Sequence, residues 1–238
     1  LAERACVVVT DEFPEFFLPR MLAAAGRKLE ALGTRLEAVD GNGLLPLRAA
    51  GRAWPTAPHF RRMLQRELPA HLGWFPQQAP LRAARALPQP DVELAPWLDD
   101  VRRRWPTPAP ALMDLQGDDP HAAARALAAL PIDHGVPPVA FRGGADKAAR
   151  VLTGFLDRKL ATYATRRNEA EDPSNSGLSP YLHWGFTSVH AVFAALAERE
   201  GWSPTRLAPA PTGKREGWWG MSPDAEAFLD ELVTWREL

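Results

Sequence analysis

Residues 174–186 read SNSGLSPYLHWGF, a run of small polar residues that leads into a proline and an aromatic-rich apolar segment. Ser179 is a favourable N-cap residue and Pro180 suits the first helical position, so the stretch predicts the start of a helix. The first N–H groups of a helix lack partners within it and carry a positive partial charge, which suits phosphate. Polar groups upstream add donors, and Gly177 would let the backbone approach a ligand closely. The residues alone leave two readings open: an ordinary helix start and an anion-binding site.

The sequence on both sides of this stretch indicates helices that pack around an apolar core. Apolar residues recur at helical spacing over residues 151–163 and 189–196, and Gly201 is expected to end the second of these helices. A last helix is expected to begin at Ser222, which precedes a proline. We therefore predict that residues 141–238 are helical.

The N-terminal part of the chain has the pattern of one βαβ unit. ACVVVT at Ala5–Thr10 is a continuous apolar run typical of a buried strand in a parallel sheet. A helix is predicted over Pro19–Leu32, and Leu36–Asp40 predicts a second strand that DGNG at residues 40–43 closes. Because one such unit leaves its outer strand edges open, we expect residues 1–50 to be the C-terminal part of a larger α/β domain.

The segment between these two parts, residues 51–140, is rich in proline and poor in strand signals, which indicates an interdomain linker. Short helices are expected at Phe60–Leu68, Ala95–Trp105 and His121–Leu130. An ordered linker is favoured over a disordered one, because its tryptophans need a surface to pack against. These tryptophans are Trp54, Trp74, Trp97 and Trp105.

The composition excludes several classes of protein. The chain has 28 Lys and Arg against 29 Asp and Glu, so bulk charge predicts no attraction to nucleic acid, although a local basic groove is compatible with it. The single cysteine, Cys6, allows neither a disulfide framework nor a cysteine-based zinc site, and we predict a cytoplasmic protein without a metal site. No run approaches the roughly 20 apolar residues of a membrane span, and the motifs of dehydrogenases, NTPases, metalloproteases and serine hydrolases are absent. The chain starts without Met and ends at TWREL in mid-pattern, which predicts a fragment of a longer protein.

Three C-terminal blocks carry a resemblance to a known family: LATYATRRN at Leu160–Asn168, SNSGLSPYLHWG from Ser174, and FLDELVTWREL at the end. In this order they resemble the photolyase/cryptochrome family, and the closest likeness is to class II-type cyclobutane pyrimidine dimer (deoxyribodipyrimidine) photolyases. VVVTDEFPEFFLPRM followed by LEAVDGNGLLPL is similar to the last βαβ unit of the family's antenna domain. The resemblance implies an α/β part followed by an all-α part. These are the end of a Rossmann-like antenna domain (residues 1–50), a long helical linker (51–140) and the first part of a helical FAD-binding domain (141–238).

The resemblance also implies a flavin site. Tyr163 would line this site, whereas its place on an apolar helix face alone would indicate a core tyrosine. The residues that would hold the FAD diphosphate are Asn175, Ser176, Gly177, Leu178 and Ser179. One departure concerns Gly177, because a basic residue often stands at this position in the family. His183 and Trp184 receive no role.

A DNA-binding surface is implied by the same likeness. Arg167 would contact the DNA backbone, although a solvated charge at a helix end is the ordinary reading of such a residue. Glu231 and Trp235 would be the catalytic residues, which border the lesion pocket and contact DNA together with Arg236. Trp235 would supply a stacking face, and Glu231 a carboxyl group that can form a hydrogen bond with an extruded base.

The implied activity is light-driven DNA repair by a carbon–carbon lyase, in which excited, reduced FAD gives an electron to a flipped-out cyclobutane pyrimidine dimer. The expected partner of this monomer is DNA that contains pyrimidine dimers, with no membrane involved, and a second antenna chromophore of unknown identity is allowed. The fragment alone is expected to be inactive, since in the family much of the flavin pocket follows the WRE block. The alternative is a cryptochrome-like FAD photoreceptor without repair activity, and a reader of DNA lesions without turnover ranks third.

Overall fold

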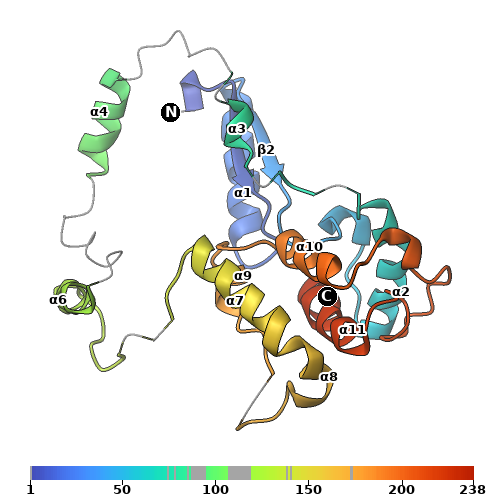
Figure 1. Cartoon of the computed structure of the whole chain (residues 1–238). Helices are drawn as coiled ribbons and strands as arrows, with labels where there is room; N and C mark the ends of the chain where they lie inside the picture. Colours follow the sequence, from blue (N-terminus) through green and yellow to red (C-terminus); the bar gives the residue numbers. More distant parts are fainter. Residues whose placement is uncertain are drawn as a thin grey trace. The chain divides into compact units, whose positions relative to one another are not determined.

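The computed structural model describes residues 2–73, 75–77, 79–84, 86, 95–106, 119–137, 139, 141–171 and 174–238 (Figure 1). The chain divides into two compact units, of which one combines Leu1–Pro76 with Arg142–Leu238 and the other is Gln77–Phe141. The larger unit contains every residue with a predicted role in the flavin or DNA site.

A βαβ unit lies at the N-terminal end of the larger unit, as the sequence predicts. β1 (Val7–Asp11) and β2 (Arg35–Val39) pair in parallel, and α1 (Leu18–Ala31) connects them and packs against β2 (Figure 1). The prediction that the first strand is buried is wrong, because Val7 and Val9 are 45% and 63% exposed. In the described residues the sheet consists of these two strands, and one crossover helix can cover only one face of it.

Short helices make up the rest of the larger unit. In chain order they are η1 (Ala2–Arg4), η2 (Leu47–Ala50), α2 (Ala57–Glu67), η3 (Leu68–Ala70), α7 (Ala145–Arg158), η5 (Leu160–Thr162), α8 (Tyr163–Arg166), α9 (Ser179–His183), α10 (Val189–Arg199), η6 (Pro204–Arg206), α11 (Pro223–Leu229) and η7 (Asp230–Trp235). The last of these, η7, is a π-helix that continues α11. Such turns often occur at functional sites, so the end of this helix is of particular interest.

Two predicted helix boundaries of the C-terminal part are confirmed. The Ser222 side chain caps α11 by accepting a hydrogen bond from the N–H of Ala225 at 3.3 Å. Gly201, with a φ of 56°, follows the end of α10, where the left-handed conformation favours glycine. The described residues are therefore compatible with an α/β part followed by helices, while the identities as antenna domain and FAD-binding domain stay predictions.

One hydrophobic core joins helices from distant parts of the chain. Phe60 of α2 is buried in the same cluster as Phe155 of α7, Phe193 of α10 and Leu229 of α11. The helix α2 lies within the predicted linker, so part of residues 51–140 packs with the C-terminal helices. The predicted domain boundaries at residues 50 and 140 stay predictions.

Buried polar contacts fix α2 against the C-terminal helices. The guanidinium of Arg61 contacts Oδ1 of Asp230 through Nε at 2.9 Å and through Nη2 at 2.8 Å. Both side chains are largely buried, at 12% and 5% exposure. Gln65 accepts the N–H of Gly213 at 2.7 Å and donates to the carbonyl oxygen of Lys214 at 2.9 Å. Because Asp230 is the first residue of η7, the ion pair holds the start of that helix in place.

The smaller unit contains three described helices, which are α3 (Leu81–Ala84), α4 (Ala95–Arg104) and α6 (Pro120–Ala128). The latter two match helices that the sequence predicts. The tryptophan argument for an ordered linker is supported only in part. Trp54 packs against the core of the larger unit and donates its indole N–H to the carbonyl oxygen of Ala50 at 3.1 Å, whereas Trp105 is 64% exposed. Trp74 and the Trp97 side chain lie outside the described residues.

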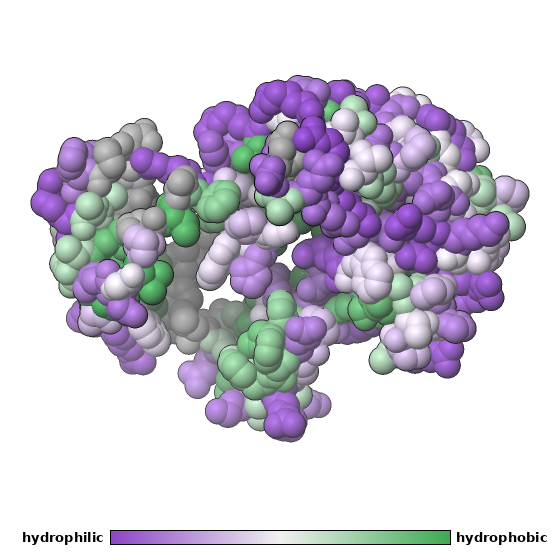
Figure 2. Space-filling model, turned by 90° about the horizontal axis from the view of Figure 1, so that it is seen from below, coloured by the Kyte–Doolittle hydropathy of each residue, from purple (hydrophilic) through white to green (hydrophobic). Residues whose placement is uncertain are grey.

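The surface carries mostly polar residues. On the face drawn in Figure 2, hydrophilic residues predominate and hydrophobic residues gather in smaller, separate patches. Large apolar side chains that remain exposed include Trp184 and Trp235, at 72% and 54%. Among the described helices we find none with both the length and the apolar character to traverse a bilayer.

Candidate functional site

The polar stretch before α9 is attached to α8 and the preceding 3₁₀ turn. Ser174 is buried, and its Oγ lies 2.8 Å from Oγ1 of Thr162. The N–H of Ser174 also donates to the carbonyl oxygen of Arg166 at 3.3 Å. The structure thus brings the predicted diphosphate-binding residues next to the helix that begins with Tyr163.

The conformation of this stretch differs in one respect from the sequence prediction. Ser179 is not the N-cap but the first residue of α9, and Leu178 occupies the N-cap position with helical φ and ψ. The cause is the side chain of Leu178, which is 1% exposed in the core and therefore fixes the backbone there. The Leu178 N–H donates to Oγ of Ser176 at 3.3 Å, and Gly177 between them has a left-handed φ of 66°.

Several main-chain amides of this turn have no partner. Among the described residues, no hydrogen bond is made by the N–H groups of Asn175, Ser176, Gly177 and Ser179. The side chains of Asn175 and Ser179 are exposed. Consecutive amides around a left-handed glycine form a concave donor surface for anions. We call residues 174–179 the open turn. The groups that could bind an anion are the amides of the open turn, more than the N-terminus of α9, which has only five residues.

Tyr163 lies in an aromatic cluster. Its ring meets those of Phe155 and Phe228 almost perpendicularly, at centroid distances of 5.6 and 5.4 Å, and only 7% of the residue is exposed. Burial raises the pKa of the Tyr163 hydroxyl, and the negative charge of Glu231 raises it further, while Arg167 opposes both. The structure therefore gives Tyr163 a packing role, and its place beside a flavin stays a prediction.

Arg167 and Glu231 form an ion pair. Nη1 of Arg167 lies 2.9 Å from Oε1 of Glu231 and donates to the carbonyl oxygen of Ala227 at 3.4 Å. The Arg167 side chain is 19% exposed and that of Glu231 is 41% exposed. The guanidinium carbon also lies 5.8 Å from the centre of the Tyr163 ring. Tyr163, Arg167 and Glu231 therefore form one cluster, although the DNA contact of Arg167 stays a prediction.

Trp235 and Arg236 lie at the other end of η7. Trp235 is 54% exposed, and Nη2 of Arg236 donates to the carbonyl oxygen of Asn42 at 3.2 Å. Within the described residues, no hydrogen bond, ion pair or ring contact links either residue to the cluster around Arg167. The structure thus separates the predicted DNA-binding residues into a cluster at Arg167 and Glu231 and an exposed end at Trp235 and Arg236.

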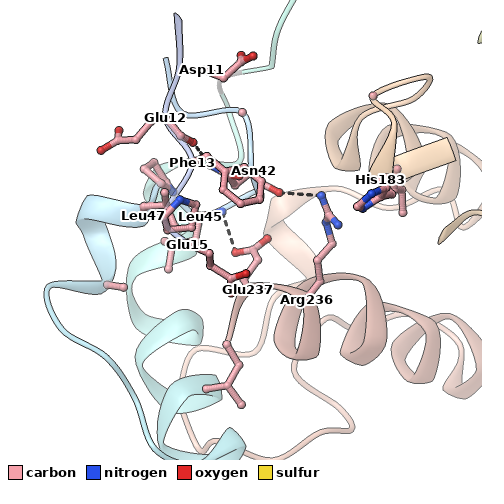
Figure 3. Close-up of a pocket in the computed structure, with 18 of the residues that line it drawn as sticks. Asp11, Glu12, Phe13, Glu15, Asn42, Leu45, Leu47, His183, Arg236 and Glu237 are labelled. Carbon is pink, nitrogen blue, oxygen red and sulfur yellow. Dashed lines mark hydrogen bonds between the residues drawn. The ribbon is translucent and has the colours of Figure 1, made fainter. Parts of the chain in front are cut away.

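Sequence reasoning missed Glu237, the residue after Arg236. Its Oε1 accepts the N–H of Leu44 at 2.7 Å. Its Oε2 accepts the N–H of Leu45 at 3.2 Å (Figure 3). Burial raises the pKa of the Glu237 carboxyl to about 7, although the two amides and Arg236 oppose the shift. The sequence shows an acidic residue in the WRE block that could have drawn attention to Glu237. No pattern near it indicates that its hydrogen-bond partner lies nearly 200 residues earlier in the chain.

A cavity of about 640 Å³ adjoins these contacts. Its lining includes Glu12, His183 and Arg236, and Figure 3 shows the Arg236 side chain reaching toward Asn42, with His183 beyond it. The cavity lies where β1 and β2 end, since Asp11 is the last residue of β1 and Asn42 closely follows β2. Ligands of α/β sheets commonly bind at the carboxyl ends of parallel strands. In the described part of the chain, no group of three or more His, Cys, Asp or Glu side chains could hold a metal ion.

Comparison with curated proteins identifies similar enzymes. The chain is 31% identical over 101 residues to the deoxyribodipyrimidine photo-lyase of Methanothermobacter thermautotrophicus, 34% over 86 residues to that of Oryza sativa subsp. japonica and 38% over 101 residues to that of Arabidopsis thaliana. The matches cover 42%, 36% and 40% of this chain, but 18%, 13% and 16% of these relatives, so the chain spans less than a fifth of their length. No protein-family model matches the chain. The resemblance to the photolyase family that the sequence predicts is confirmed by these similarities.

Proposed function

We propose that this chain, as a relative of the deoxyribodipyrimidine photo-lyases, is part of a light-driven DNA-repair enzyme that splits cyclobutane pyrimidine dimers with FAD. The observation that carries the proposal is the 31–38% identity to three curated photo-lyases. The proposal includes the finer likeness to the class II-type branch, a cytoplasmic location and a monomeric state. The site geometry supports it at two places, the open turn and the end of η7.

The open turn fits the diphosphate of FAD. Its unpartnered amides can donate to phosphate oxygens, and Ser176 and Asn175 add polar side chains. Gly177 keeps the approach clear, and even an added Cβ would meet the Val151 side chain only at ordinary contact distance, 3.7 Å. Tyr163, tied to the turn through Thr162, would border the flavin. Bound FAD would supply the electron that reaches the dimer once the reduced flavin is excited by light.

The end of the chain suits contact with an extruded base and its backbone. Trp235 offers an exposed aromatic face for stacking, and the partly exposed carboxylate of Glu231 can accept a hydrogen bond from a base. Arg167 holds that carboxylate in place by its charge at 2.9 Å. Arg167 and Arg236 would also contact DNA phosphates, which position the duplex without specifying its sequence.

A second antenna chromophore is part of the proposal, and the cavity at the ends of β1 and β2 is its candidate site. Its volume of about 640 Å³ is within the range of small-molecule pockets. Asp11, Glu12 and Glu15 line it together with one arginine, Arg236. This excess of carboxylates disfavours a strongly anionic pigment and favours a neutral or cationic one.

The alternative from another class is a cryptochrome-like FAD photoreceptor without repair activity. Both functions need the open turn, since both need FAD. They differ at the end of η7, because only repair requires that Trp235 and Glu231 engage a DNA lesion. The exposed Trp235 side chain favours repair, as a stacking platform has to be accessible to its base.

The direct test is repair of an oligonucleotide that carries one cyclobutane pyrimidine dimer. The full-length protein of which this chain is proposed to be a part would be purified, loaded with FAD, reduced and illuminated, and dimer loss followed by chromatography against a dark control. We expect light-dependent loss of the dimer that Trp235→Ala abolishes while FAD stays bound. Trp184→Ala, which removes another exposed tryptophan, is the matched control and should retain repair. Photoreduction without dimer loss would favour the photoreceptor, and failure to bind FAD would contradict both functions.

A further inference from the structure

The C-terminal block and the turn after β2 are joined by two kinds of contact. Both carboxylate oxygens of Glu237 accept main-chain N–H groups, from Leu44 at 2.7 Å and from Leu45 at 3.2 Å. Arg236, one residue earlier, donates to the carbonyl oxygen of Asn42 at 3.2 Å. Consecutive residues after η7 therefore hold both the donors and an acceptor of one turn, and Figure 3 shows the bonds to Asn42 and Leu45 among them.

The turn itself is shaped to admit the carboxylate. Gly43 faces Glu237 so closely that a Cβ at this position would overlap the carboxyl group. Gly41, two residues earlier, has open space where its Cβ would be. Neither glycine has a φ in the left-handed region, so backbone strain does not require glycine at either position. The requirement at Gly43 comes from the approach of Glu237, which is an observation independent of the hydrogen bonds.

These contacts can affect the residues that are proposed to bind the lesion, because Glu237 lies close to Trp235 in the chain. Trp235 is the last residue of η7 and is only two residues away from Glu237. The start of η7 is fixed by the buried pair of Asp230 and Arg61, and Val233 and Thr234 before Trp235 are buried. The bonds of Arg236 and Glu237 to the turn hold the chain on the other side of Trp235.

We propose that Glu237 is a positioning residue: by binding the amides of Leu44 and Leu45, it fixes the end of η7 to the turn after β2 and so orients Trp235 and Arg236 toward DNA. The role of Glu237 in orienting Trp235 and Arg236 toward DNA rests on the proposed function. The attachment of Glu237 to the turn can be tested without DNA. Glu237 is expected to touch neither the lesion nor the flavin, and it acts only through its two neighbours.

The two hydrogen bonds favour the ionised carboxylate, whereas burial favours the protonated form and has the larger effect. Two oxygens that each accept an N–H match a carboxylate, whereas a protonated carboxyl group brings a donor of its own against one amide. The charged groups that face Glu237 are Arg236 on its own segment and Asp40 from the turn, and Glu12 and His183 line the adjoining cavity. Because burial raises the pKa of Glu237 to about 7, the attached carboxyl group holds its proton more tightly than a solvent-exposed one would, so the attachment should weaken as the pH rises through neutrality.

The experiment compares four forms of the purified protein: wild type, Glu237→Gln, Gly43→Ala and Gly41→Ala. Glutamine keeps one acceptor but turns an NH₂ group toward the second amide, and an alanine at position 43 displaces the carboxylate. Gly41→Ala is the matched control. Hydrogen exchange of the Leu44 and Leu45 amides measures the attachment, and relative affinity for dimer-containing over undamaged DNA measures the orientation.

We expect both amides to exchange roughly tenfold faster in Glu237→Gln and Gly43→Ala, with lesion discrimination lowered roughly tenfold. Affinity for undamaged DNA should fall less than affinity for dimer-containing DNA, whereas a general loss of folded protein would lower both equally. Discrimination by the wild type should decrease from pH 6 to pH 8 and stay flat in Glu237→Gln. Gly41→Ala should behave as wild type.

Two results would overturn the inference while leaving the proposed function intact. Unchanged exchange in Glu237→Gln would mean that the carboxylate does not hold the turn. Faster exchange with undiminished discrimination would mean that the turn does not position the lesion-side residues. A wild type that does not prefer dimer-containing DNA would instead contradict the proposed function and with it the positioning role, and the exchange data would then report on the attachment alone.

Discussion

Two turns of the larger unit use the same chemical group, the main-chain N–H, in opposite ways. In the open turn, residues 174–179, several amides have no partner among the described residues. In the turn after β2, residues 40–47, which we call the closed turn, four amides donate to carboxylates. Asp40 accepts from Asn42 and Leu47, at 3.1 and 2.6 Å, and Glu237 accepts from Leu44 and Leu45.

The difference shows how one donor can serve either structure or binding. A buried amide without an acceptor is unfavourable, so a turn inside the fold needs acceptors from the chain itself. The closed turn obtains them from a residue at the far end of the sequence and thereby joins the α/β part to the last helix. The open turn lies largely at the surface, where water can satisfy its amides, and under the proposed function the FAD diphosphate would replace that water. Substitutions that loosen the closed turn, or that give the open turn an acceptor, test this comparison directly.

The largest effect is expected when η7 loses its buried anchor. Arg61→Ala would leave the carboxylate of Asp230, which is 5% exposed, without its partner, at a cost of about 3–5 kcal/mol in the free energy of unfolding. Since η7 leads into Glu237, amide exchange should accelerate in the closed turn more than at Leu178, whose amide bonds within the open turn. Chemical denaturation and hydrogen exchange measure these effects.

Arg62→Ala provides the matched control for this substitution. Arg62 follows Arg61 on α2 but is exposed, and its hydrogen bonds within the described part of the chain go to the carbonyl oxygen of Thr212. Its loss should change the free energy of unfolding by less than about 1 kcal/mol. Equal destabilisation by both substitutions, or equal acceleration at both turns, would contradict the view that the Arg61–Asp230 pair supports the closed turn specifically.

The next effect is the pH dependence of stability that the carboxylate of the closed turn causes. Burial raises the pKa of Glu237 from 4.5 to about 7. Because the folded-state pKa lies above the unfolded one, the stability that this group contributes is fully present below pH 4.5 and is lost as the pH rises through 7. The wild type should therefore lose roughly 2–3 kcal/mol relative to Glu237→Gln between pH 5 and pH 8.

Urea denaturation of both proteins at several pH values tests this expectation. Subtracting one pH profile from the other cancels the contributions of groups that both proteins share. One such group is His190, whose pKa is lowered by burial. Parallel pH profiles would show that Glu237 is not desolvated. A loss of stability that occurs together with weaker lesion discrimination would show that deprotonation of Glu237 loosens the closed turn.

The two turns also differ in how far the sequence alone could predict them. The stretch SNSGLSP predicts a polar turn before a helix, because neighbouring residues carry that pattern. Even there, the burial of Leu178 moves the N-cap away from Ser179. The closed turn could be predicted only as DGNG after a strand. Its partner Glu237 is nearly 200 residues away, and no local pattern encodes such a pairing.

The fold shows the same division between local and distant effects. The parallel β1 and β2, the helix α1 and the capped start of α11 at Ser222 follow from local patterns and are confirmed. The exposure of Val9 and the packing of α2 with the C-terminal helices depend on which surfaces meet. Such contacts are set by tertiary structure, which periodicity within a segment cannot report.

A smaller effect is expected when the open turn is given an acceptor of its own. Ser176→Asp places a carboxylate where Oγ now accepts the Leu178 amide, and its charge would satisfy neighbouring amides and repel a diphosphate. We expect FAD affinity to fall about thirtyfold, or about 2 kcal/mol, with little change in stability. Ser176→Asn has a similar shape without the charge and should bind nearly as wild type. Flavin fluorescence titration measures both, and equal affinities would separate the open turn from the flavin.

The smallest effect distinguishes the two readings of Arg167, a DNA contact and a partner of Glu231 at 2.9 Å. If Arg167 neutralises a phosphate, Arg167→Gln should reduce the slope of log affinity against log salt by about 0.9 for duplex DNA, in addition to weakening binding. If it only holds Glu231, the slope should stay unchanged and discrimination for the dimer should fall. Arg199→Gln breaks a similar but distant ion pair with Asp157, at 2.8 Å, and should alter neither quantity. We expect the reduced slope, because the Arg167 side chain keeps 19% of its surface exposed and so can reach a phosphate while its pair with Glu231 persists. An unchanged slope would limit the DNA-backbone contacts of this region to the end of η7, where the closed turn holds Arg236.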